Sequence, residues 1–143
     1  MRDLSKQVGQ LADRLGLDLE LDAQEVLRDV LERKGFRLAR EPFAVIVDGE
    51  ADVVAAVESP EGRRFWVLVE VKGRVRRREM GEWLERLGDA SFRERLRQEG
   101  VEKPYLPYVF GLRLYGGVEE MARDSGVGLL DWRGERVAPR LWE

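Results

Sequence analysis

The sequence predicts a single α/β domain in which a mixed sheet of four to five strands is flanked by helices, with a helix at its N-terminus. Its 143 residues fall in the range of one domain. Apolar residues make up 43% of the chain, enough to fill one core. The hydrophobic pattern switches between helical and extended periods in the order helix, β-meander, helix, strand, helix, strand.

The N-terminal sixteen residues predict a short amphipathic helix that ends at Gly16, because apolar residues recur there at steps of three and four: Leu4, Val8, Leu11 and Leu15. This stripe packs either on its own domain or on a second copy, which would make a homodimer. An extended lead-in to residue 21 follows, and the main domain is expected to span 22–143. It opens with a second helix from Asp22, a suitable N-cap, to Gly35.

Extended segments follow. Short strands are expected at Phe36–Ala39 and Phe43–Val47, and two apolar runs, Asp52–Glu58 and Phe65–Lys72, flank the turn sequence Ser59-Pro60-Glu61-Gly62. These two runs predict a β-hairpin. The second run is apolar on both faces, as expected of a strand in the middle of a sheet.

The remaining residues continue the alternation. A helix or a pair of helices is expected over Arg78–Glu99, with a break at Gly88 or Ser91. A strand at Tyr105–Tyr115, a helix at Val118–Ser125 and a strand at Val127–Asp131 complete the predicted domain, listed here in chain order.

Composition excludes several kinds of chemistry. The chain has no cysteine and no histidine, which rules out disulfides, Cys/His zinc sites and histidine-paired nucleophiles. Its net charge of −3 is not that of a protein that binds nucleic acid through bulk charge, so an anionic partner needs a local basic patch. The 21 arginines against 4 lysines, with 37% charged residues, favour a thermophilic source.

No segment predicts membrane insertion or export. The longest apolar stretch, Pro42–Val47, is far shorter than the roughly 20 residues that span a bilayer. The charged N-terminus has no apolar block after it, unlike a secretory signal. We therefore expect a cytoplasmic protein without a membrane partner.

Three charged residues in the hairpin carry the candidate chemistry. Glu70 and Lys72 lie two residues apart at the end of the most apolar strand, so they share one face of the sheet. If Glu58 pairs with Phe65, Asp52 lies diagonal to both, although a slip of one residue would change which side chains face each other. Two close carboxylates favour a hard cation, Mg²⁺ or Mn²⁺, and a neighbouring lysine suits phosphodiester hydrolysis.

This arrangement resembles the PD-(D/E)XK nuclease superfamily. The resemblance is carried by Leu31-Glu32-Arg33-Lys34-Gly35-Phe36, Glu50-Ala51-Asp52-Val53-Val54 and Val67-Leu68-Val69-Glu70-Val71-Lys72, and it covers residues 22–131. It is similar to the Holliday-junction-resolvase-like branch and to uncharacterised archaeal or bacterial branches. The resemblance implies a restriction-endonuclease-like fold, metal ligands at Asp52 and Glu70, and a catalytic lysine at Lys72.

The resemblance also implies an acid on the first helix of the domain that completes the metal site. Counting back from Gly35-Phe36 places Gln24 at that position, with Glu25 next to it. The helical wheel favours Gln24, a neutral and weaker ligand, because Glu25 points toward solvent. Glu50 would share the face of Asp52 if the strand continues, and it could compensate.

A basic cluster follows the candidate catalytic strand, and its members are Arg74, Arg76, Arg77 and Arg78. It could hold the phosphates of a nucleic acid beside the metal, or it could be an ordinary charged surface. Its position next to Glu70 and Lys72 favours the first interpretation.

The leading hypothesis is therefore an Mg²⁺-dependent or Mn²⁺-dependent DNA endonuclease, a phosphodiesterase that uses Asp52, Glu70 and Lys72. The alternative is a catalytically inactive nuclease-fold module that binds nucleic acid or a protein partner, which the neutral Gln24 favours. In a third hypothesis the three residues form a structural ion-pair network in a thermophilic domain.

Overall fold

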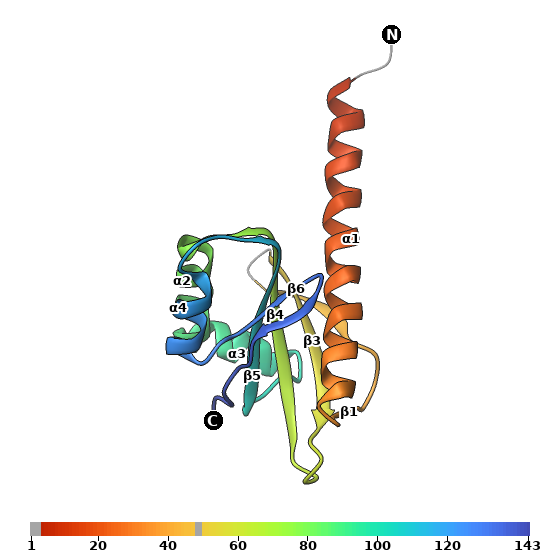
Figure 1. Cartoon of the computed structure of the whole chain (residues 1–143). Coiled ribbons are helices and arrows are strands. Elements are labelled where there is room, and N and C mark those ends of the chain that lie inside the picture. Colours follow the sequence, from red (N-terminus) through yellow and green to blue (C-terminus); the bar gives the residue numbers. More distant parts are fainter. Residues whose placement is uncertain (1–3, 48–49) are drawn as a thin grey trace.

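The chain folds into one seven-stranded mixed sheet with helices on both faces (Figure 1). The computed structural model describes residues 4–47 and 50–143, with side chains described at 19–47 and 52–143. The elements in order are α1 (Leu4–Arg33), β1 (Arg37–Leu38), β2 (Phe43–Val47), β3 (Glu50–Glu58), β4 (Arg64–Val75), α2 (Arg77–Gly88), α3 (Ala90–Gln98), β5 (Tyr105–Leu114), α4 (Val118–Ser125), β6 (Gly128–Asp131) and β7 (Gly134–Val137).

The sheet confirms the predicted mixed α/β class but has more strands than the four to five expected. Strands run in the order β1-β3-β4-β5-β6-β7, and β2 pairs with β3 along the same edge as β1. The β4–β5 and β5–β6 pairs are parallel, and the others are antiparallel. The sequence pattern misses β7 because Val137 is the only buried residue of its four, too few for a period of two to show.

The two faces of the sheet are covered by different helices (Figure 1). Side chains at odd positions of β3 and β4, such as Val53 and Val69, pack with Ala23, Leu27 and Leu31 of α1. Side chains at even positions, such as Val54 and Leu68, pack with buried residues of the other three helices: Met80, Trp83, Leu87, Phe92, Leu96, Val118 and Ala122. The alternation of a strand thus assigns these residues to two cores, except that Val75 near the end of β4 packs in the core of the other three helices.

The N-terminal region differs from the prediction, because α1 is one continuous helix of 30 residues. It passes through Gly16, where a helix end was expected, and through residues 17–21, expected to be extended. A single glycine costs a helix only about 1 kcal/mol, and the leucines around it are good helix formers. The side chains of the apolar stripe from Leu4 to Leu15 lie outside the described ones. No helix of the described residues is long and apolar enough to cross a membrane.

The β3–β4 hairpin forms as predicted, but its register differs by one residue. Glu58 pairs with Arg64 instead of Phe65, so Asp52 lies directly opposite Glu70. The turn closes tightly because the backbone N–H of Ser59 donates to the carbonyl of Arg63 at 2.8 Å, and the Ser59 hydroxyl accepts from the N–H of Arg63 at 3.1 Å. The loop therefore has five residues, 59–63. The first residues to pair across it lie one position closer to the turn on β4 than predicted.

The core facing α1 contains one polar cluster. Tyr108 on β5 is fully buried, and its hydroxyl donates to Glu135 Oε2 at 2.7 Å. Lys34 at the end of α1 pairs with the same carboxylate at 2.8 Å. Glycine is needed at position 128 on the neighbouring strand, because a Cβ there would lie 2.4 Å from the Tyr108 ring. Burial and the bond to Glu135 raise the pKa of Tyr108 above its ordinary value of 10.0.

This raised pKa predicts a loss of stability in alkali that Tyr108→Phe removes. Above pH 10 the unfolded chain releases the tyrosine proton while the folded chain keeps it, so stability that is complete below pH 10 falls as the pH rises. We expect the wild-type free energy of unfolding to fall by about 1.4 kcal/mol per pH unit more than that of Tyr108→Phe. Urea unfolding over about three pH units around the ordinary tyrosine pKa, from roughly pH 8 to pH 11, measures both slopes, and equal slopes would contradict the assignment.

Candidate active site

The centre of the candidate site is a pair of buried carboxylates. Asp52 on β3 is 1% exposed and Glu70 on β4 is 3% exposed. They are direct partners across the antiparallel pair, a position in which Cβ atoms lie about 4.5–5.5 Å apart. Both belong to the even positions of their strands and therefore face α2 and α3, not α1. The two acids are close together, as predicted, but they lie directly opposite each other and not on a diagonal.

A single arginine of α2 lies between the two acids. Arg86 donates from Nη2 to Asp52 Oδ2 at 2.9 Å, and its Nη1 reaches Asp52 Oδ1 at 3.4 Å and also pairs with Glu70 Oε2. The guanidinium thus bridges both carboxylates. Two buried negative charges would otherwise repel each other at this separation, so Arg86 supplies the compensating charge.

Aromatic rings hold this guanidinium from α2 and α3. Its central carbon lies 4.5 Å from the ring centroid of Phe92 and 5.3 Å from that of Trp83, within the range of cation–π attraction. The Arg86 side chain is 19% exposed. Sequence reasoning did not single out Arg86 among the many charged residues of its helix. Its spacing of three from Trp83 was the signal, since that spacing places it beside the buried apolar residues of α2, which are Met80, Trp83 and Leu87.

Lys72 lies at the rim of the acid pair. Its Nζ is 3.5 Å from Glu70 Oε1, and its side chain is 33% exposed while that of Glu70 is 4% exposed. A lysine in this position keeps its ammonium group at the boundary between the buried acids and solvent. It can therefore contact a substrate that approaches from outside.

The accessory residues expected on the first helix lie elsewhere. The core contacts of α1 place that helix on the opposite face of the sheet from Asp52 and Glu70. Gln24 is half-buried, Glu25 is exposed, and both line a surface groove along α1 with other residues of that helix. Glu50 is the first residue of β3, but its side chain lies outside the described ones.

The four arginines of the basic cluster differ in how firmly they are held. Arg76 bonds to Glu79 through Nε at 2.7 Å, and this bond lowers the pKa of the Glu79 carboxyl below its ordinary value. Arg78 pairs with Glu82 at 3.2 Å. The guanidinium of Arg77 occupies the space where a Cβ at Gly117 would lie. Arg74 is exposed, and it makes no ion pair within the described part of the chain.

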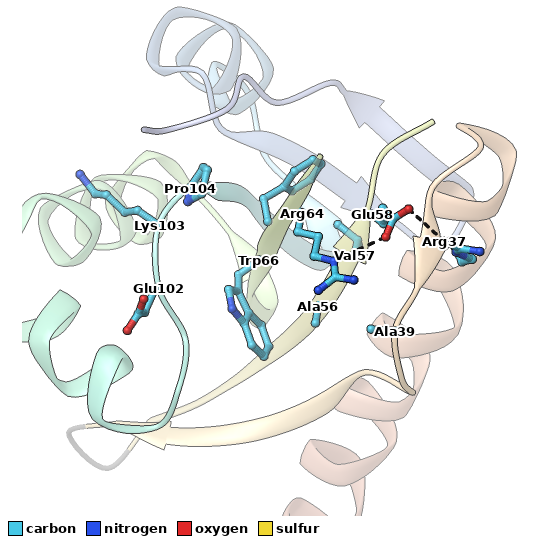
Figure 2. A pocket seen from close by; sticks show the side chains of 11 residues that line it. Arg37, Ala39, Ala56, Val57, Glu58, Arg64, Trp66, Glu102, Lys103 and Pro104 are labelled. Atoms are coloured by element: carbon cyan, nitrogen blue, oxygen red, sulfur yellow. Dashed lines mark hydrogen bonds and ion pairs between the residues drawn. The ribbon is translucent and has the colours of Figure 1, made fainter. Parts of the chain in front are cut away.

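The cavity shown in Figure 2 is separate from the acid pair and lies at the opposite, turn end of the hairpin. It has a volume of about 530 Å³ and is lined by residues that include Arg37, Glu58, Trp66 and Lys103. The Arg37 guanidinium pairs with Glu58 at 2.9 Å, and Arg64 approaches the same carboxylate at 3.5 Å. Arg37, Glu58 and Arg64 thus pair with one another, and none of the acid-pair residues lines the cavity.

The donor set at the acid pair fits a hard divalent cation. Asp52 and Glu70 offer carboxylate oxygens from one face of adjacent strands, the ligand type that Mg²⁺ and Mn²⁺ prefer. A positive group already lies between them, so the surroundings stabilise a cation there. No third acidic side chain of the described residues joins these two. Among the described side chains, a metal at this position would therefore have two carboxylate ligands.

Comparisons with known proteins give one structural similarity. No family model and no curated protein sequence matches the chain. The crystal structure of an XisH family protein from Nostoc punctiforme is similar over 82% of this chain and 98% of that chain, with 20% sequence identity and a TM-score of 0.43. This is a distant similarity, and function has to be derived from the residues of this chain.

Proposed function

We propose that this protein is a metal-dependent deoxyribonuclease with a restriction-endonuclease-like fold. One observation carries the proposal: two almost fully buried carboxylates, Asp52 and Glu70, face each other across adjacent strands with Lys72 at the rim. Burying two opposed acids costs free energy that a partner must offset, and such arrangements are concentrated at functional sites. The sequence motif that led to the nuclease hypothesis supplies these same three residues.

In this proposal Asp52 and Glu70 hold Mg²⁺ or Mn²⁺. When bound, such an ion polarises a phosphodiester and lowers the pKa of a water molecule. The chain's own part is to orient: the paired strands fix both carboxylates, and the apolar residues around them exclude bulk water. Lys72 contacts the phosphate or the attacking water from the rim and stabilises negative charge that develops on the phosphate oxygens.

The basic cluster is the proposed DNA-binding element, and Arg74 is its clearest member because no carboxylate of the described residues neutralises it. Contacts of this kind bind phosphates and carry no sequence information. Arg76 and Arg78 pair with acids of their own helix, but their side chains are 53% and 75% exposed, so they remain accessible to phosphate.

Replacing Arg74 is expected to weaken DNA binding in a salt-dependent way. Losing one phosphate contact reduces the slope of log K against log salt by about 0.9. Arg74→Gln should show this change in fluorescence anisotropy titrations of duplex DNA at several salt concentrations. Arg97→Gln is the matched control, since Arg97 is an exposed arginine on α3 that pairs with Glu94 at 2.6 Å. An unchanged slope in Arg74→Gln would show that Arg74 does not contact a DNA phosphate.

One observation favours the alternative function, a nuclease-fold module that binds nucleic acid or a protein without cutting it. Arg86 already neutralises the acid pair and occupies the space between the carboxylates. A site whose acids are permanently paired would have no room for a metal. The alternative predicts DNA or protein binding that does not respond to divalent cations.

A cleavage assay distinguishes the two functions. The wild-type protein is incubated with branched, duplex and single-stranded DNA in Mg²⁺, in Mn²⁺ and in EDTA, over a range of salt and temperature. Cleavage that requires the divalent cation supports the nuclease. Binding without cleavage under every condition supports the binding module and contradicts the proposed enzyme.

A further inference from the structure

Arg86 contacts both carboxylates of the acid pair, and the proposed nuclease chemistry does not use it. It lies within hydrogen-bond distance of Asp52, pairs with Glu70 and is enclosed by Phe92 and Trp83. These contacts with two carboxylates and two aromatic rings show that the guanidinium is part of the site and not a surface side chain that reaches in by chance.

Charge counting shows that Arg86 and a divalent cation compete. The two acids contribute two negative charges, and Arg86 together with Lys72 contributes two positive charges. These four described side chains therefore balance one another in charge. A divalent cation added without the departure of Arg86 would leave two excess positive charges in a mostly buried site, and charges only a few Å apart repel strongly there.

Space leads to the same result. The Nη atoms of Arg86 lie within hydrogen-bond distance of the carboxylate oxygens that would bind the metal, at 2.9 Å for Asp52 Oδ2. A guanidinium and a metal ion cannot both occupy the same side of these carboxylate oxygens. The Arg86 side chain is 19% exposed and so has a route to solvent. Glu82 of the same helix lies four residues before it, and Asp89, which follows the helix directly, lies three residues after it; both spacings allow pairing.

We propose that Arg86 is an internal counter-cation, a positioning residue that holds Asp52 and Glu70 while no metal is bound and that a divalent cation must displace. The inference depends on the proposed metal-dependent function. This role explains how two buried acids can persist without a metal ion. It also implies that Arg86 lowers the affinity of the site for the metal ion.

The test is Mn²⁺ affinity measured by titration calorimetry, with no DNA and no cleavage readout. Arg86→Gln should bind Mn²⁺ at least about tenfold more tightly than the wild type, because a competing unit charge is removed from a few Å away. Arg97→Gln, the surface control, should bind like the wild type. Equal or weaker binding by Arg86→Gln would overturn the inference.

A second variant keeps the test decisive if Arg86→Gln does not fold. Arg86→Lys retains the positive charge, but one ammonium group lacks the planar fork that serves two carboxylates together. We expect it to fold and to bind Mn²⁺ more tightly than the wild type, and equal affinity would count against displacement. In the wild type, the Nε–H signal of Arg86 in NMR spectra should shift as Mg²⁺ is added, and an unchanged signal at saturation would also contradict it.

The outcomes separate this inference from the proposed function. Mn²⁺ binding by the wild type with no gain in either Arg86 variant overturns the role of Arg86 and leaves the metal site in place. If neither the wild type nor the variants bind Mn²⁺ at millimolar concentration, the metal-dependent function and the inference fail together.

Discussion

Replacing Lys72 by alanine should lower the rate of divalent-cation-dependent DNA cleavage by about 10²–10⁴-fold while the protein stays folded. The ammonium group lies 3.5 Å from Glu70 at the solvent boundary, where it can stabilise charge on the phosphate. The partly exposed pair with Glu70 contributes only about 1 kcal/mol or less to stability. Single-turnover cleavage of the best DNA substrate, together with thermal unfolding, measures both effects.

Lys103→Ala is the control for this experiment. Lys103 lies toward the turn end of the hairpin, where its Nζ donates to the carbonyl of Glu143 at 3.1 Å. Its removal takes away the same charge and should leave the cleavage rate unchanged. If Lys72→Ala cleaves at the wild-type rate, or loses activity only because it unfolds, Lys72 is not catalytic.

The metal-free Arg86→Met protein should be less stable than the wild type by about 3–5 kcal/mol, the usual cost of removing one partner of a buried ion pair. Asp52 and Glu70 are 1% and 3% exposed and would lose their shared cation. For a chain of this length the loss corresponds to a fall in Tm of about 10–17 °C. Urea unfolding in the presence of EDTA measures it.

A second substitution shows whether charge causes this loss. Adding Glu70→Gln to Arg86→Met removes one of the two negative charges and should restore part of the stability. If the double variant is no more stable than Arg86→Met, lost packing against Phe92 and Trp83 explains the effect. A wild-type stability for Arg86→Met would mean that the bridge contributes nothing.

Much of the fold could be predicted because its strands and helices have clear periodicity. Val118–Ser125 forms the helix α4 with the predicted bounds, and Phe43–Val47 forms β2 with the predicted bounds. The prediction divided the long α1 into two helices because glycine and aspartate, found at positions 16 and 22, are frequent at helix ends. Local preference of about 1 kcal/mol at one glycine does not decide the course of a 30-residue helix.

The site could be predicted only as far as local pairing determines it. Asp52 and Glu70 were expected to be close because a hairpin joins their strands, but the register depends on how the Ser59 turn closes. Arg86 lies 34 residues from Asp52 and 16 from Glu70 in the sequence. The spacing from Trp83 places Arg86 beside the buried residues of α2, but its contact with the two acids also depends on how α2 packs against the sheet.

The most direct test of the proposed nuclease is the dependence of DNA cleavage on Mn²⁺ concentration in the wild type and in Asp52→Asn. Asparagine is close in shape to aspartate but lacks the charge that binds a cation. The account predicts cleavage that saturates with Mn²⁺ in the wild type and is lost or needs far more Mn²⁺ in Asp52→Asn. Cleavage with the same Mn²⁺ dependence in both proteins would contradict it.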